Sequence, residues 1–267
     1  MKKIFVTLIA LAVVFTPVFV KADNHSNENV YNEKEEVILS QETKYSKTVT
    51  EYENVVRDSY GNISSADIVS SRSYEITEEE YNNADLENAV VNRSYTTVET
   101  VYKRMTTYLL YENGTYRYKN QVNWLNFPQA RNYDIIGIGH YGSVSVSGTP
   151  YFLMEYYTVS GAHHYGYFHY NQNFTYGSSA TFPLPLENLS SLTVTYYYDV
   201  QKTNPNSTIY SQAAFGDYSH SVNTNYSLSD VVNHHVVNQN AGIVLDATIY
   251  NYFDTIDEAD VYWSGSW

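Results

Sequence analysis

The sequence predicts an all-β protein, mainly an antiparallel β-sandwich or jelly-roll-like fold, with one short helix in its N-terminal half. The first observation is composition, because 30 of the 267 residues are Tyr and only 16% are charged. Tyr and Thr suit a pleated, half-buried surface. The second is the strict alternation of apolar and polar residues in several segments, which is typical of strands with one wet face. The third is the clusters of Gly, Asn, Pro and Ser between those segments.

Residues 1–22 have the pattern of a secretory signal peptide that is cleaved after Ala22. Two lysines precede an apolar run over 4–20, and a small residue ends the segment. An uncleaved membrane anchor is the alternative, because the run approaches the length of a spanning helix. Pro17 and the A-x-A-like end favour cleavage, and no later segment is apolar enough to span a bilayer. We therefore expect a secreted, extracellular protein of bacterial type.

The mature chain is expected to be strongly acidic. Cleavage after Ala22 leaves 12 basic and 29 acidic side chains, a formal charge of −17. Such a surface repels phosphate backbones and anionic membranes, so we expect no nucleic-acid partner and no stable membrane span after cleavage. The chain has no Cys, which excludes disulfides, thiol catalysis and Cys-based metal sites.

Three portions are expected after the signal peptide. Residues 23–40 are polar and weakly patterned, which predicts a flexible acidic lead-in. A β-hairpin with a short helix is expected over 41–112, and the antiparallel sandwich over 113–267. Whether these are one domain or two is left open.

Residues 101–131 carry five basic side chains and one acidic side chain, so they either neutralise the acidic N-terminal part or form an anion-binding patch.

The N-terminal portion predicts one hairpin and one helix. Two runs rich in Thr, Tyr and Val, 45–57 and 63–76, flank a short turn that contains Gly. Thr77 and Glu80 have the spacing of a capping box, which predicts a helix over 78–88. The acidic residues in its first turn suit the positive end of the helix dipole.

Strand patterns are clearest after residue 93. The runs 93–111 and 116–124 meet across Asn113-Gly114, a strong hairpin marker. Apolar and polar side chains alternate in 116–124 and again in 191–201. Many short strands of this kind favour a sandwich or barrel-like fold. Further strand-like runs are 133–146, 151–159, 163–170, 209–215, 243–252 and 259–263.

Motifs for catalysis are not found, and we predict no catalytic residue and no cofactor. The sequence has no G-x-S-x-G elbow, no H-E-x-x-H and no P-loop. The G-x-G within 136–140 is interpreted as a strand whose glycines allow close packing. A secreted glycan hydrolase with paired carboxylates is the alternative function. Its candidate acids are Glu155, Asp199, Asp217 and Asp246.

The histidines do not predict a metal site. His163 and His164 point to opposite faces of a regular strand. His163 and His169 share a face but lie about 20 Å apart at the rise of a strand. A site would need partners on other strands, which the sequence does not reveal, and none is predicted.

A β-pore-forming protein is a lesser alternative. The Ser/Thr-rich hairpin over 45–76 has the amphipathic character that a membrane barrel uses. However, acidic residues would lie on both faces of this hairpin, so any face turned toward lipid would carry charge. These acids are Glu51, Glu53 and Asp67.

Aromatic placement predicts a binding surface. If residues 163–170 form one strand, its alternate side chains on one face are His163, Tyr165, Tyr167 and His169. Tyr197 is expected to point outward from its own strand. Exposed rings on a rigid sheet form flat platforms for sugars or peptides. The alternative is that these rings only form cross-strand pairs that stabilise the sheet. We therefore predict a non-catalytic extracellular binding protein whose partner is a cell-surface polysaccharide or a protein, with the oligomeric state left open.

Overall fold

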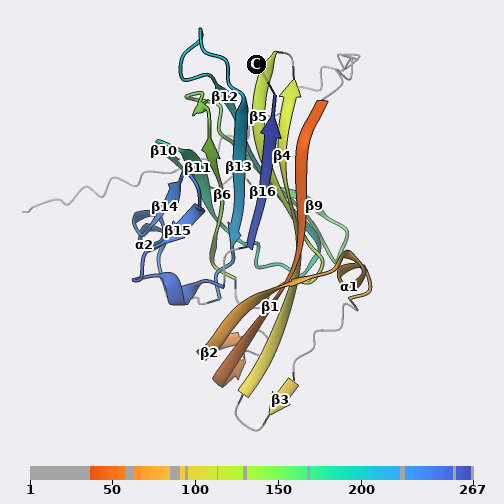
Figure 1. The fold of residues 1–267 in the computed structure, drawn as a ribbon. Helices are drawn as coiled ribbons and strands as arrows, with labels where there is room; N and C mark the ends of the chain where they lie inside the picture. Colours follow the sequence, from red (N-terminus) through yellow and green to blue (C-terminus); the bar gives the residue numbers. More distant parts are fainter. Residues whose placement is uncertain are drawn as a thin grey trace, which may run out of the picture. The chain divides into compact units, whose positions relative to one another are not determined.

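The computed structural model confirms that the chain is all-β. Nearly all the regular structure in the compact unit Lys34–Trp267 is antiparallel strand (Figure 1). The proposed signal peptide and the turn between the first two strands lie outside the described residues. The structure describes residues 37–57, 63–84, 91–93, 96–112, 114–128, 131–166, 169–222, 226–254 and 257–265.

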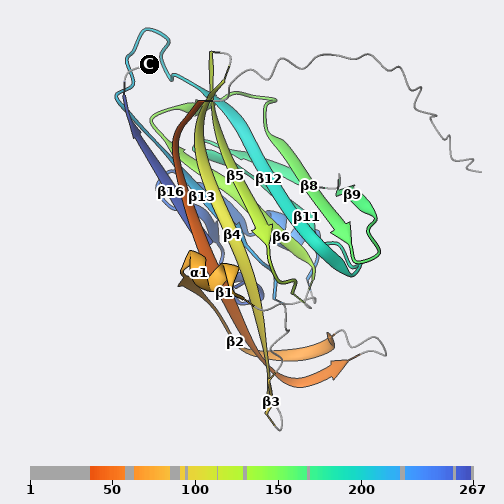
Figure 2. The same cartoon turned by 90° about the vertical axis from the view of Figure 1, so that its right-hand side faces the viewer.

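Most strands belong to two sheets, which we call sheet A and sheet B. Sheet A has the order β2-β1-β4-β5-β12-β8-β9, with β3 on β4 and β7 on β12 (Figure 2). Its strands are β1 (Val37–Arg57), β2 (Ile63–Ile76), β3 (Val91–Arg93), β4 (Thr96–Glu112), β5 (Thr115–Trp124), β7 (Val144–Ser145), β8 (Tyr151–Thr158), β9 (His163–Gly166) and β12 (Leu189–Gln201). Sheet B has the order β10-β11-β6-β13-β16. Its strands are β6 (Tyr133–Tyr141), β10 (Tyr170–Phe174), β11 (Gly177–Pro183), β13 (Ser211–Ser219) and β16 (Asp257–Ser264).

Both predicted hairpins are present in sheet A. β1 pairs with β2, and β4 pairs with β5 in a ladder that ends at Glu112↔Thr115. β4 also pairs along β1, so sheet A continues without interruption across the boundary expected near residue 112.

β1 is longer than the sequence pattern indicates. It begins at Val37, inside the segment 23–40 for which we expected a flexible lead-in. Val37 pairs with Tyr111, and Ser40 pairs with Leu109, so β4 provides a partner for the added residues. The backbone hydrogen bonds of this long-range ladder order residues whose own sequence has little strand pattern.

The described residues include two short α-helices where one was predicted. In α1 (Glu78–Asn82), the Thr77 hydroxyl accepts from the Glu80 amide and the Glu80 carboxylate accepts from the Thr77 amide, so the capping box is confirmed. α1 ends at Asn82, six residues before the predicted end at 88. The prediction missed α2 (Leu228–Asn233), which begins with a similar reciprocal cap between Ser227 and Asp230.

The run 163–170 is not one strand, as the sequence pattern suggested. Its first residues form β9 at the edge of sheet A, and Tyr170 begins β10 at the edge of sheet B. The chain therefore passes from one sheet to the other within this run. Parity along the sequence consequently does not place His163 and His169 on a common face.

One hydrophobic cluster combines side chains from both sheets. The predicted inward parities are confirmed, because Val122 of β5 and Val194 of β12 are fully buried. Sheet B contributes Ile136, Phe182 and Val261 to the same cluster. The core therefore lies between sheets A and B.

Several tyrosines are buried in this core with their hydroxyls satisfied. Tyr118 donates to the side-chain oxygen of Gln212 at 2.7 Å, and Tyr198 donates to a backbone carbonyl oxygen at 2.9 Å. Tyr218 donates to Asp134. A buried Tyr needs such a partner because an unpaired hydroxyl is costly to remove from water.

The glycines of β6 allow a close backbone approach, as predicted. A small antiparallel hairpin of β14 (His235–Asn238) and β15 (Gly242–Leu245) packs against this strand. A Cβ on Gly139 would lie 2.5 Å from the Asn238 carbonyl oxygen, and a Cβ on Gly137 would lie 2.8 Å from Ile243 Cγ1. Any larger residue would separate the hairpin from the sheet.

Candidate functional site

The outer face of sheet A carries a row of aromatic side chains across β12, β8 and β9. Phe152 and Met154 of β8 are buried, so the alternate positions on β8 point away from the core. Tyr151 and Tyr157 occupy two of these positions and are 45% and 40% exposed. Tyr165 of β9 is 46% exposed. We call this row the aromatic strip and define it as Tyr197, Tyr151, Tyr157, His163 and Tyr165.

At one end of the aromatic strip, two tyrosines stack across neighbouring strands. Tyr151 and Tyr197 are paired in the β8–β12 ladder, and their ring centroids are 4.8 Å apart at an interplanar angle of 24°. The Arg117 guanidinium lies 4.3 Å from the Tyr197 ring centroid. Arg117 is held there by ion pairs to Asp199 and Glu112, at 2.8 and 3.0 Å. This basic residue is thus neutralised locally, and its cation–π contact fixes the Tyr197 ring.

At the other end, a histidine is fixed by a tyrosine and a carboxylate. His163 pairs with Tyr157, and the two rings are parallel with centroids 4.2 Å apart. His163 Nε2 lies 2.7 Å from Glu155 Oε1, and its ring centroid lies 4.6 Å from that of Tyr165. Three polar groups therefore stand beside the exposed rings: an imidazole, a carboxylate and a phenol.

The two ends are joined by β8. Tyr151 and Tyr157 are separated by six positions, which corresponds to about 20 Å along a strand. The side chains between them on the same face are Leu153 and Glu155. The aromatic strip is therefore an elongated surface built on three paired strands rather than on a loop.

The structure brings together three of the five predicted site residues. His163, Tyr165 and Tyr197 lie on the outer face of sheet A. His169 instead stacks on the core residue Phe152, with ring centroids 4.7 Å apart. Tyr167 lies outside the described residues.

Sequence reasoning missed Tyr151 and Tyr157. Both were inside the predicted strand 151–159, and both share the parity opposite to Phe152 and Met154. That alternation was a sufficient signal for their exposure. Their contacts with Tyr197 and His163 depend on strand pairing, which the sequence does not show.

The four carboxylates considered for a hydrolase each have a different local partner. Glu155 contacts His163, and Asp199 pairs with Arg117. Asp217 is fully buried, and Asp246 accepts hydrogen bonds from Thr248 in a turn. Within the part of the chain that the structure describes, no group of three or more His, Asp or Glu side chains is arranged to hold a metal ion. These positions give no geometric support for a catalytic pair.

Comparisons with known proteins do not assign a function. The sequence matches no family model, and no curated protein is significantly similar to it. Among the described residues, no helix has the length and apolar character needed to cross a membrane. A functional conclusion must therefore be built from the geometry of this chain's own residues.

Proposed function

We propose that the protein is exported, is cleaved after Ala22 and acts outside the cell as a non-catalytic β-sandwich protein that binds carbohydrate on the aromatic strip. The observation that carries this proposal is the cross-strand stack of Tyr151 and Tyr197 on an exposed sheet face. The core shared by sheets A and B supports the sandwich interpretation.

The aromatic strip has the chemical features that a sugar polymer requires. Pyranose rings present flat C–H faces that pack on aromatic rings, while their hydroxyls need donors and acceptors at the rim. Glu155, His163 and the Tyr165 hydroxyl supply these polar groups. The rings are held by stacking and by the sheet, so binding loses little side-chain entropy.

The charge of the chain favours an uncharged polymer. The mature chain has a formal charge of −17, which repels polyanions such as nucleic acids and acidic glycans. Arg117, whose guanidinium lies on the Tyr197 ring, is already paired with two carboxylates. We therefore propose a neutral cell-surface or cell-wall polysaccharide as the ligand class.

Removal of either stacked ring is expected to weaken retention on insoluble polysaccharide. Tyr151→Ala and Tyr197→Ala each remove one ring of the stacked pair, and a loss of about 1.4 kcal/mol per ring corresponds to about tenfold weaker binding. The measurement is a pull-down of the mature protein on a panel of neutral insoluble polysaccharides, with bound fractions fitted to give affinities. Tyr210→Ala is the matched control, because Tyr210 is 73% exposed and lies outside the sheets.

The same experiment distinguishes a binding protein from a hydrolase. Retention without release of reducing ends supports the proposal. Release of reducing ends that a single change such as Glu155→Gln abolishes would support the hydrolase instead. Equal retention of Tyr151→Ala, Tyr197→Ala and the wild-type protein would rule out the aromatic strip as the binding surface.

A further inference from the structure

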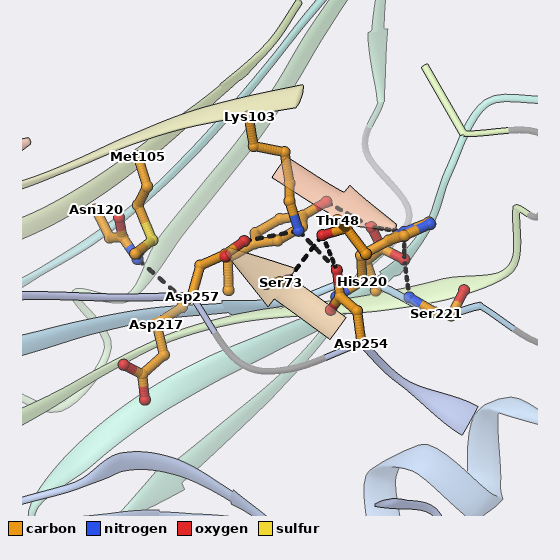
Figure 3. A network of polar contacts seen from close by, with 12 residues as sticks. Thr48, Ser73, Lys103, Met105, Asn120, Asp217, His220, Ser221, Asp254 and Asp257 are labelled. Atoms are coloured by element: carbon orange, nitrogen blue, oxygen red, sulfur yellow. Dashed lines mark hydrogen bonds and ion pairs between the residues drawn. The ribbon is translucent and has the colours of Figure 1, made fainter. Parts of the chain in front are cut away.

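A lysine lies in the core between two aspartates. Lys103 of β4 is 1% exposed, and its Nζ lies 2.8 Å from Asp254 Oδ2 and 2.6 Å from Asp257 Oδ2 (Figure 3). Asp254 and Asp257 are 2% and 8% exposed. Lys103 belongs to sheet A, whereas Asp257 is the first residue of β16 in sheet B. The contact therefore joins the two sheets.

The surroundings of this cluster are apolar and aromatic. Lys103 Nζ lies 5.4 Å from the Trp124 ring centroid and 5.5 Å from that of Tyr218. Charges are expensive in such an interior unless they are paired. One ammonium group faces two carboxyl groups here, so the cluster has one acidic group more than it has bases.

The two carboxyl groups have different environments. Asp254 accepts hydrogen bonds from the Thr48 hydroxyl at 2.9 Å and from the His220 amide at 2.9 Å, in addition to Lys103. Burial raises the pKa of Asp257, an effect that Lys103 opposes and Asp254 reinforces. Burial would lower the pKa of Lys103, but the two carboxylates raise it overall.

The different environments of the two acids suit them to different roles in a reaction with the Lys103 amine. Burial raises the pKa of Asp257 and so favours its protonated form, and a protonated carboxyl is an electrophile for an amine. Asp254 accepts a hydrogen bond from Nζ at 2.8 Å, so it is placed to act as a base.

We propose that Lys103 and Asp257 condense in the folded protein to form an amide bond between Nζ and Cγ. A proton first passes from the Lys103 ammonium to the Asp257 carboxylate. The neutral amine then attacks Cγ, Asp254 takes a proton from Nζ and returns it to the departing hydroxyl, and one water is released. The Nζ–Cγ bond forms, one Cγ–O bond breaks, and the net charge of the three side chains is unchanged.

Geometry favours this reaction over hydrolysis of its product. The reacting groups already form an ion pair at 2.6 Å, and positioning of this kind replaces a bimolecular encounter with an intramolecular step. The Trp124 and Tyr218 rings shield the Nζ side of this contact from bulk water. Asp257 also lines a cleft of about 550 Å³ between the β1–β2 hairpin and β16, which gives the released water a path out.

The bond would covalently cross-link sheet A to sheet B in a chain that cannot form disulfides. A protein with no Cys cannot join its sheets by disulfides, and outside the cell a covalent link of another kind protects against unfolding and proteolysis. This inference does not depend on the proposed carbohydrate binding, because it concerns the core and not the outer face of sheet A.

Mass spectrometry of the purified wild-type protein tests the proposal directly. The intact protein is expected to be one water lighter than its sequence, about 18 Da. Proteolysis is expected to give a branched peptide in which Lys103 is joined to Asp257. Lys103→Arg keeps the positive charge without the nucleophilic amine and is expected to have its full mass. Asp254→Asn keeps both reacting groups but removes the base, so the bond is expected to form about a hundredfold more slowly.

Circular dichroism confirms that each protein is folded before its mass is interpreted. A folded wild-type protein that retains its full mass after prolonged incubation would overturn the proposal. A loss of water that persists in Lys103→Arg would overturn it as well, because the missing water would then come from another site. The wild-type measurement is decisive even if both variants fail to fold.

Discussion

Replacement of Lys103 by Met is expected to lower the free energy of unfolding by about 3–5 kcal/mol. Met fills a similar volume, so the main effect is electrostatic: Asp254 and Asp257 remain buried without their cation. An uncompensated buried charge is among the largest penalties that one substitution produces. The penalty is expected to decrease toward acid pH, because burial raises the pKa of Asp257 and protonation of that carboxyl removes its unpaired charge. The proposed amide bond would make the loss larger still.

Urea unfolding of the folded protein, followed by tryptophan fluorescence, measures this effect. Lys119→Met is the matched control, because Lys119 lies on the outer face of sheet A and contacts the Tyr108 ring at 5.1 Å. A half-buried cation on an outer sheet face is expected to contribute less than about 1 kcal/mol. If Lys103→Met were as stable as Lys119→Met, the buried cluster would have no stabilising role.

Strands with one buried and one wet face could be predicted from the sequence. In β5 and β12 burial alternates along the strand, so the period of two is visible in residue type. β6 and β13 are buried at almost every position, because sheet A covers one face and the β14–β15 hairpin packs on the other. Such strands show no alternation, and their pairing partners cannot be inferred from pattern.

The long-range contacts could not be predicted. Lys103 lies in the basic run 101–131, which was expected either to neutralise the acidic N-terminal part or to form an anion-binding patch. Its partner Asp254 lies 151 positions later in the chain, and together they form a buried pair. The aromatic strip shows the same limit, since β8 and β12 pair across many intervening residues. Parity indicated that Tyr197 is exposed, whereas only the ladder shows that Tyr151 stacks on it.

The passage of the chain between sheets explains the error at His169. Residues 163–170 look like one continuous strand because every position is aromatic, His or Gly, and each of these types occurs on both faces of a sheet. With no apolar–polar contrast in the run, nothing in residue type marks the position where the chain leaves sheet A. Only the pairing of β9 with β8 and of β10 with β11 locates it.

Asp217→Asn is expected to stabilise the protein at neutral and alkaline pH. Asp217 is fully buried, its Oδ2 accepts from the Ile243 amide, and its Oδ1 has no hydrogen-bond partner among the described residues. Burial raises the pKa of this carboxyl well above its ordinary value; the Ile243 amide opposes this rise, and nearby acids including Glu258 and Asp260 reinforce it. The folded protein therefore holds a proton at Asp217 that the unfolded chain releases.

The direction of the pH dependence follows from this difference in bound protons. Above the ordinary pKa of Asp, the unfolded state gains free energy by ionising, so stability falls by about 1.4 kcal/mol per pH unit until the folded pKa is reached. Asn keeps an acceptor for the Ile243 amide and never ionises, so its stability is expected to change less between about pH 5 and pH 8. Urea midpoints measured across this range for wild-type protein, Asp217→Asn and the exposed control Glu187→Gln test it. Parallel curves for all three proteins would show that Asp217 is ionised in the folded state, and a neighbouring group would then have to supply a counter-charge.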